Sequence, residues 1–292
     1  MLAQQMLNGL IVGATYALFA LGFTLMFGVL RVINLTYGVY FSAGALIALA
    51  FTRNIAPTLW LALPAAALAT GLLAVLLDAL LLTRLRRAQA PELASLMVTL
   101  GATLLLYAVM TAALGTEIRR FPPGLAGTAI EAGGLRISGT QMLILITTFI
   151  MVGGLLYLLR RTRLGLAIRA LAENPGAAQM MGVDAGRVVA FVSFASGALG
   201  GTAGVLIGLN YNAIQPYMGE AMMLKGFAVI IIGGLGDIGG ALVAGLLLGV
   251  LEVLTAGYLA STLKDAVGFV LLVLTLWLRP DGLFGRSTIR RA

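Results

Sequence analysis

The sequence predicts an all-α, polytopic membrane protein, and three observations lead to that prediction. Only 10% of the 292 residues are charged, 60% are hydrophobic, and the mean hydropathy is +1.03. Apolar stretches recur along the chain, and many approach the roughly 20 residues that a helix needs to cross a bilayer. The basic residues gather in short clusters between these stretches. This composition favours one membrane domain over two soluble domains.

The apolar pattern predicts about eight or nine transmembrane segments, including interrupted or half-spanning helices. We expect two of them to be doubtful as full crossings, because Ala221–Ile232 is too short and Leu35–Phe51 is marginal. The domain should extend over 1–292. The predicted segments are Met6–Leu30, Leu35–Phe51, Pro57–Leu82, Leu93–Leu114, Gln141–Leu159, Val188–Leu209, Ala221–Ile232, Ile238–Tyr258 and Ala266–Leu278.

The arginines predict which side of the membrane each loop faces, because short cytoplasmic loops carry an excess of basic residues. We therefore expect 83–92, a long loop over about 160–187 and a short tail over 279–292 to be cytoplasmic. The segments 115–140 and Tyr211–Glu220 should lie outside. The N-terminus is external if all three early segments cross, and internal if one of them is re-entrant. The clusters are Arg84, Arg86 and Arg87; Arg160, Arg161, Arg163 and Arg169; and Arg279, Arg286, Arg290 and Arg291.

The composition also limits the chemistry of the chain. The net charge of +8 is explained by this orientation and by anionic lipid headgroups, so it does not indicate nucleic-acid binding. The absence of cysteine excludes disulfides and thiolate chemistry, and the absence of histidine removes the commonest general base and metal ligand. We predict no metal site and no catalytic residue.

Small residues recur at helical spacing, which lets helix backbones approach closely in lipid. This pattern predicts a tightly packed bundle and does not by itself indicate transport. The three stripes are Ser193, Gly197, Gly201, Gly204 and Gly208; Gly9, Gly13, Ala17, Ala20 and Thr24; and Ala241, Gly245, Gly249, Glu252 and Ala256.

Two short segments interrupt the apolar pattern. The first break contains Asn34, Thr36 and Tyr37 before Gly38, and the second has five glycines between 233 and 240. Broken backbone survives in a bilayer only where protein buries it or a cavity lies beside it. Paired breaks in the two parts of a chain indicate a transport pathway near the midplane, although ordinary short turns are the alternative. The predicted pathway residues are Asn34, Thr36, Tyr37, Lys225, Gly233, Gly234, Gly236 and Asp237.

Ionisable residues inside spans face a polar interior or each other. Lys225 and Asp237 flank the second break, which makes them the stronger pathway candidates. Glu252 lies on a small-residue stripe and should form a structural hydrogen bond, whereas Asp78 lies near a span end and should reach toward water. The segment 234–237 also matches the Gly-x-Gly-Asp pattern of intramembrane aspartyl proteases, but the Tyr-Asp partner motif of that family is absent.

In the longest loop, the sequence predicts an amphipathic helix that ends near Glu173, then a Pro-Gly turn, and then a short helix over Ala177–Met181 that ends at Gly182. Its small apolar surface suits a groove in a partner protein. The alternative is a helix lying on the lipid surface.

This loop, with its pattern Gly165-x3-Arg169-Ala170-x2-Glu173-Asn174-Pro175-x2-Ala178-x3-Gly182, resembles the cytoplasmic loop of branched-chain amino acid permeases of ATP-binding-cassette importers (LivH-type). The segment 177–182 also resembles the wider importer pattern Glu-Ala-Ala-x3-Gly without its Glu. Further matches run in register along the whole chain: Asn8-Gly9, Thr15-Tyr16-Ala17-Leu18, Phe27-Gly28-Val29, Ile33-Asn34-Leu35, Lys225-Gly226-Phe227, Gly233-Gly234-Leu235-Gly236 and Arg279-Pro280-x-Gly282-Leu283-Phe284-Gly285.

The resemblance implies a permease fold and a set of partners. These are a second homologous permease, identical or related, two cytoplasmic ATP-binding subunits and an extracytoplasmic substrate-binding protein. The chain has no Gly-x4-Gly-Lys-(Ser/Thr) loop, so ATP would be used by partner subunits and no cofactor bound here. The residues implied to couple the permease to the ATPases are Arg169, Glu173, Asn174, Pro175, Ala177, Ala178 and Gly182.

The implied function is import of branched-chain or related small amino acids through the bacterial cytoplasmic (inner) membrane, by a translocation subunit that is not itself an enzyme. The chain departs from the family pattern at Thr36 and Tyr37 and again over 237–240, which leaves the substrate open. Urea, short amides and other amino acids are carried by related systems. The alternative is a self-contained secondary transporter driven by ions.

Overall fold

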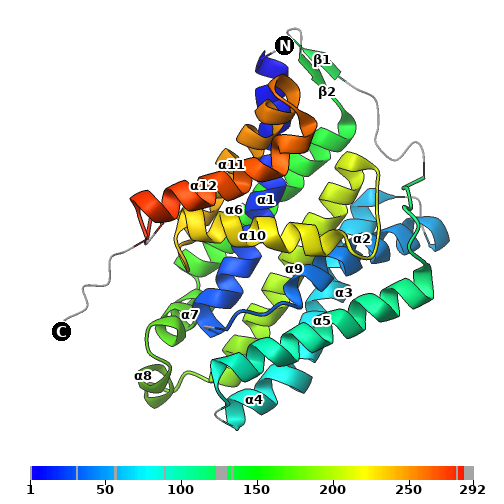
Figure 1. The fold of residues 1–292 in the computed structure, drawn as a ribbon. Helices are drawn as coiled ribbons and strands as arrows, with labels where there is room; N and C mark the ends of the chain where they lie inside the picture. The colour runs from blue at the N-terminus through cyan, green and yellow to red at the C-terminus, as the bar shows by residue number, and fades with distance from the viewer. Residues whose placement is uncertain are drawn as a thin grey trace.

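The computed structural model describes residues 2–30, 32–55, 58–88, 90–122, 130–132, 135–280 and 282–285, and they form an almost wholly helical bundle (Figure 1). Arg286, Arg290 and Arg291 of the third predicted cluster lie outside the described residues. The helices are α1 (Leu2–Leu30), α2 (Tyr37–Asn54), α3 (Leu59–Leu77), α4 (Thr83–Arg87), α5 (Glu92–Leu114), α6 (Gly139–Arg161), α7 (Arg163–Glu173), α8 (Pro175–Met180), α9 (Ala185–Tyr211), α10 (Met218–Gly233), α11 (Ile238–Tyr258) and α12 (Lys264–Leu278).

The lengths of the helices confirm the prediction of a polytopic protein with shortened segments. Among the described residues, seven helical stretches are long and apolar enough to cross a membrane: Leu2–Leu30, Leu59–Arg86, Leu93–Leu114, Gly139–Arg161, Ala185–Tyr211, Ile238–Tyr258 and Ser261–Leu278. The two doubtful segments became α2 and α10, of 18 and 16 residues, and neither is among the seven.

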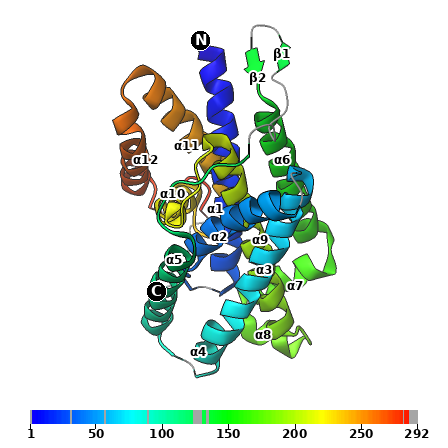
Figure 2. The same ribbon diagram turned by 90° about the vertical axis from the view of Figure 1, so that its right-hand side faces the viewer.

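The helices α4, α7 and α8 lie at one end of the bundle, which we call the arginine end, and the N-terminus lies at the opposite end (Figures 1 and 2). The segments expected outside contact each other. Arg119 and Ile214 pair through two backbone hydrogen bonds of 2.8 Å, and the Phe121 N–H donates to Asn212 Oδ1. The segment 83–92 and the long loop, which carry two of the three arginine clusters, therefore lie at the same end of the bundle.

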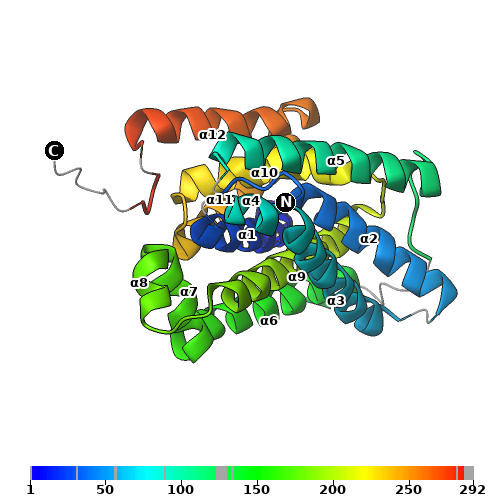
Figure 3. The same cartoon turned by 90° about the horizontal axis from the view of Figure 1, so that it is seen from below.

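The small-residue stripes lie where the central helices meet. Helix α1 runs through the middle, with α5, α10 and α12 along one side and α6, α7 and α9 along the other (Figure 3). A Cβ at Gly13 would lie 2.8 Å from the Cα of Leu246 on α11, and one at Gly201 would collide with Thr70 on α3. Because no side chain fits at these contacts, the glycines bring the backbones together, as the stripes predict.

Two local features differ from the sequence prediction. A short hairpin, β1 (Ile130–Ala132) and β2 (Leu135–Ile137), lies at the N-terminal end. Asp78 opens a π-helical turn, Asp78–Leu82, between α3 and α4, and its carboxylate accepts from Arg86 at 2.6 and 3.0 Å. The expectation that Asp78 reaches toward water is wrong, because its side chain is only 6% exposed and Arg86 folds back to pair with it.

Candidate functional site: two helix breaks, a cavity and a loop

The first break is a turn whose polar side chains bond to one another. Asn34 Oδ1 accepts from the Thr36 N–H at 3.0 Å and from the Thr36 hydroxyl at 2.6 Å, and the Thr36 hydroxyl lies 3.0 Å from that of Tyr40. All three residues are buried. The Asn34 side chain therefore takes the place of backbone hydrogen bonds that the missing helical turn would have made.

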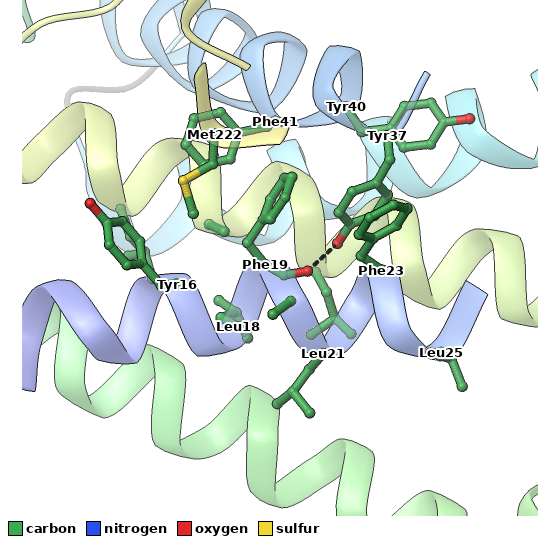
Figure 4. Packing of buried hydrophobic residues seen from close by; sticks show 14 of the residues in the cluster. Tyr16, Leu18, Phe19, Leu21, Phe23, Leu25, Tyr37, Tyr40, Phe41 and Met222 are labelled. Atoms are coloured by element: carbon green, nitrogen blue, oxygen red, sulfur yellow. Dashed lines mark hydrogen bonds between the residues drawn. The ribbon is translucent and has the colours of Figure 1, made fainter. Parts of the chain in front are cut away.

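Tyr37, the first residue of α2, lies inside an aromatic cluster formed with α1 (Figure 4). Its ring stacks on Phe23, with centroids 5.2 Å apart, and is tilted against Phe19 at 4.6 Å. Its hydroxyl donates to the Phe19 carbonyl at 2.9 Å. The sequence predicts Tyr37 as a pathway residue, and the structure places it in the packed core between α1 and α2.

The second break is shaped by backbone conformation. Gly234 and Gly236 have φ values of 107° and 85°, which glycine adopts without strain, so α10 ends at Gly233 and α11 begins at Ile238. Asp237 caps α11, because its Oδ1 accepts from the Gly240 N–H at 2.6 Å. A Cβ at Gly233 would lie 2.6 Å from the backbone nitrogen of Ala241, so the two helix ends touch.

The segment after α12 closes over the second break. The Leu283 and Phe284 N–H groups donate to the carbonyls of Ile232 and Gly233 at 2.8 and 3.2 Å. These carbonyls end α10 and have no partner within the helix. The segment Gly282–Gly285 thereby ties the tail to the C-terminal end of α10.

A cavity of about 1020 Å³ lies between the breaks at the arginine end, and we call it the break cavity. Ile33 of the first break and Gly236 and Asp237 of the second line it, together with Arg169 and Glu173 of α7. Leucine and valine side chains from α1, α5 and α6 complete a mostly apolar wall. The structure thus brings two predicted pathway residues together with two predicted coupling residues, whereas the side chains of Asn34, Thr36 and Tyr37 are buried away from it.

The long loop forms the two helices that the sequence predicts, but Pro175 and Gly176 begin α8 instead of forming a turn before it. Helix α7 ends at Glu173, and Asn174 caps α8 by accepting from the Ala177 N–H at 3.0 Å, with Pro175 at the first helical position. Gly182 then reverses the chain with φ of 85°. The Arg169 guanidinium donates to the Leu159 carbonyl at the end of α6, which fixes α7 against that helix.

The apolar surface of the loop differs in detail from the prediction. Ala178 is only 5% exposed and lies on the buried side of α8, while Met180 and Met181 are 89% and 86% exposed. The Val183 N–H closes the turn on the Ala178 carbonyl at 3.0 Å. We therefore define the knob as Met180 and Met181, and Ala178 as a packing residue beneath it.

Lys225 lies away from the second break, in a charged cluster between α1, α10, α11 and α12. Its Nζ donates to both Glu252 oxygens at 2.9 and 2.8 Å, to Asp265 at 2.9 Å and to the Tyr16 hydroxyl at 3.1 Å. Tyr16 in turn donates to Glu252 at 2.7 Å. The expectation that Glu252 forms a structural hydrogen bond is confirmed.

Residues 5–276 match the model of a family described as the permease component of the branched-chain amino acid transport system. The chain belongs to this family. The permease is 32% identical to the high-affinity branched-chain amino acid transport system permease protein BraD of Pseudomonas aeruginosa, over 99% of this chain and 97% of the relative. It is 30% identical to LivH of Escherichia coli K12 over the same shares, and 31% identical to a probable LivH of Methanocaldococcus jannaschii over 97% and 92%.

A more distant likeness covers only part of the permease. The ribose import permease protein RbsC of Haemophilus influenzae is 32% identical over 37% of this chain and 33% of the relative. No solved structure matches the permease.

Sequence reasoning missed two members of the charged cluster, Tyr16 and Asp265. Tyr16 occurs in a segment that resembles the family, and Asp265 begins the last span, but neither position reveals its partner. The sequence did offer one indication. An ionisable residue inside a membrane span is energetically unfavourable unless it is paired, so Lys225 implies a partner on a neighbouring helix. That reasoning would have paired Lys225 with a carboxylate without saying which one.

Proposed function

We propose that the permease is the membrane-spanning subunit of an ATP-driven importer that moves branched-chain or related small amino acids into the cytoplasm. Full-length similarity to permease proteins of that system supports the proposal. The arginine end would then face the cytoplasm, the N-terminal end would face outward, and the chain would lie in the bacterial inner membrane.

The observation that carries the proposal is the break cavity. It has the second break on one side and α7 on the other, so a push on α7 changes the wall of the same cavity that Asp237 lines. When one packed helix is displaced, its neighbours shift with it from one discrete packing arrangement to another. A motor acting on the loop would therefore alter access to a space inside the membrane.

Two features support the proposed partners: the sequence has no phosphate-binding loop, and the loop at the arginine end exposes two methionines. The sequence has no phosphate-binding loop of the Gly-x4-Gly-Lys-(Ser/Thr) type, so ATP would be hydrolysed by two separate cytoplasmic subunits. Met180 and Met181 form the surface that enters a groove of those subunits. A second permease and an extracytoplasmic binding protein complete the system, and that binding protein would set most of the substrate selectivity.

A self-contained, ion-coupled transporter is the second candidate, and the charged cluster favours it. Carboxylates and a lysine inside a bundle are the groups that ion-driven transporters use. The pairing of Lys225 with both Glu252 and Asp265 is compatible with such a role.

Reconstitution separates the two candidates. Liposomes containing the permease with its partner permease, ATPases and binding protein should take up leucine only with ATP. The double variant Met180→Ser, Met181→Ser should assemble but lose most ATP-driven uptake, while Leu164→Ser, at an exposed position of α7, serves as the control. Uptake driven by a Na⁺ or H⁺ gradient in liposomes with the permease alone would reject the importer.

A further inference from the structure

A second cavity, of about 430 Å³, lies at the N-terminal end of the bundle, and we call it the polar cavity. It is formed by α1, α6, α9, α11 and the start of α12, and it plays no part in the break cavity or the loop. We infer that the polar cavity binds the ammonium and carboxylate groups of a zwitterionic amino acid, with Glu252 and Lys264 as the two charged anchors. This inference rests on the proposed import function.

The two charges that line the polar cavity are of opposite sign and come from different helices. Glu252 lies on α11 with a side chain only 5% exposed, and Lys264 is the first residue of α12. A zwitterion presents one group of each sign. Hydrogen bonds between ionised partners are about twice as strong as neutral ones, so these anchors would dominate recognition.

The charged cluster leaves Glu252 able to take a cationic partner. Lys225 supplies one positive charge against two carboxylates, those of Glu252 and Asp265. A carboxylate offers about four acceptor positions, and Lys225 and Tyr16 occupy three of those on Glu252. One acceptor position therefore remains on Glu252, which lines the polar cavity, and it suits an ammonium group.

Neutral polar groups line the rest of the cavity. Gln5 and Asn8 come from α1, Gln141 from α6 and Asn210 from α9. Asn8 Oδ1 accepts from Gln141 at 3.1 Å, while the side chains of Gln5, Asn210 and Lys264 form no hydrogen bond or ion pair with any other residue in the described part of the chain. These free donors and acceptors converge on one space, as they do in sites for small polar ligands.

Ligand binding at Glu252 would also affect the ion pair between Glu252 and Lys225. An ammonium group at Glu252 competes with Lys225, and Lys225 belongs to α10, which ends at the second break. Weakening that ion pair would release α10 from α11 near the N-terminal end. A ligand in the polar cavity is thereby connected through one helix to the wall of the break cavity.

The test measures binding to the assembled permease–ATPase complex in nanodiscs, without the binding protein. Equilibrium dialysis compares labelled leucine with 4-methylpentanoate, which lacks the ammonium group, and 3-methylbutylamine, which lacks the carboxylate. We expect saturable leucine binding, and binding about tenfold or more weaker for each analogue, as expected when a charged hydrogen-bond partner is lost.

Variants assign the site. Lys264→Met should weaken leucine binding about tenfold and leave 3-methylbutylamine unaffected, and Lys264→Arg should restore leucine binding. Arg120→Met is the matched control, because Arg120 is an exposed cation outside the helices that does not line the cavity. Equal leucine binding by Lys264→Met and the wild type, or no saturable binding at all, would overturn the inference. ATP-driven uptake by the same complex, reconstituted in liposomes together with the binding protein, shows whether the import function survives that result.

Discussion

Side chains hold the first break together, whereas backbone geometry and a capping carboxylate shape the second. At the first, Asn34 and Thr36 bond to each other in a buried turn, and Tyr37 stacks on Phe23. At the second, Gly234 and Gly236 take positive φ values, and Gly236 is exposed beside the break cavity. Both interrupt a membrane helix and both border the break cavity, the first through Ile33, but the second borders it with glycine backbone.

This difference indicates unequal roles. A turn whose polar atoms are paired and whose ring is packed on all sides resists movement, because each displacement breaks a hydrogen bond or opens a void. A glycine turn beside a cavity moves at low cost. We therefore interpret the first break as an anchor and the second as the mobile wall of the pathway.

The largest effect should come from Tyr37→Ala at the anchor. The ring is fully buried, and its removal opens a void between α1 and α2, which should lower the free energy of unfolding by about 3–5 kcal/mol. Tyr37→Phe is the control, because it removes only the hydrogen bond to Phe19 and should cost about 1 kcal/mol. Thermal unfolding of the purified permease in detergent measures both. An unfolding temperature for Tyr37→Ala equal to the wild type would contradict the anchor role.

Smaller losses of stability should follow from replacing the polar residue of each break, Asn34 in the first and Asp237 in the second. Asn34→Ala leaves buried Thr36 groups without an acceptor and should cost about 1–3 kcal/mol. Asp237→Ala removes a helix cap and should cost about 1 kcal/mol.

Uptake by the reconstituted complex distinguishes the roles of these two residues. Asn34→Ala should reduce uptake only in proportion to the loss of folded protein, whereas Asp237→Ala should slow uptake per folded complex. If Asn34→Ala instead slows uptake per folded complex and Asp237→Ala does not, the first break is the mobile wall and the second is the anchor.

Much of the fold was predictable because its signals are local. Span lengths follow from runs of apolar residues, and the turn between α7 and α8 follows from Asn174 and Pro175, which have fixed preferences at a helix start. The marginal lengths of α2 and α10 were also visible in the sequence.

The site was predictable only in part, because its contacts join distant residues. Lys225 meets a carboxylate 27 positions away and a tyrosine 209 positions away, and no local pattern encodes such a pairing. Ala178 and Met180 are equally apolar neighbours in the sequence, yet only the packing of α8 decides that one is buried. Thr36 and Tyr37 were predicted to line a pathway because they are polar residues within a span. The structure shows that their polar groups instead form hydrogen bonds that close a buried turn.

The smallest stability effect with a clear functional consequence should come from Gly236→Ala. The nearest atom to an added Cβ is the Gly28 Cα at 4.0 Å, so the methyl group has room, and the cost is conformational, about 1 kcal/mol for φ of 85°. A stiffer second break should slow ATP-driven uptake several-fold while ATPase assembly persists. Gly101→Ala in α5 is the matched control, because its added Cβ meets no atom within 4 Å and a helical alanine is favourable. If both variants transport at the wild-type rate, the second break does not move during transport.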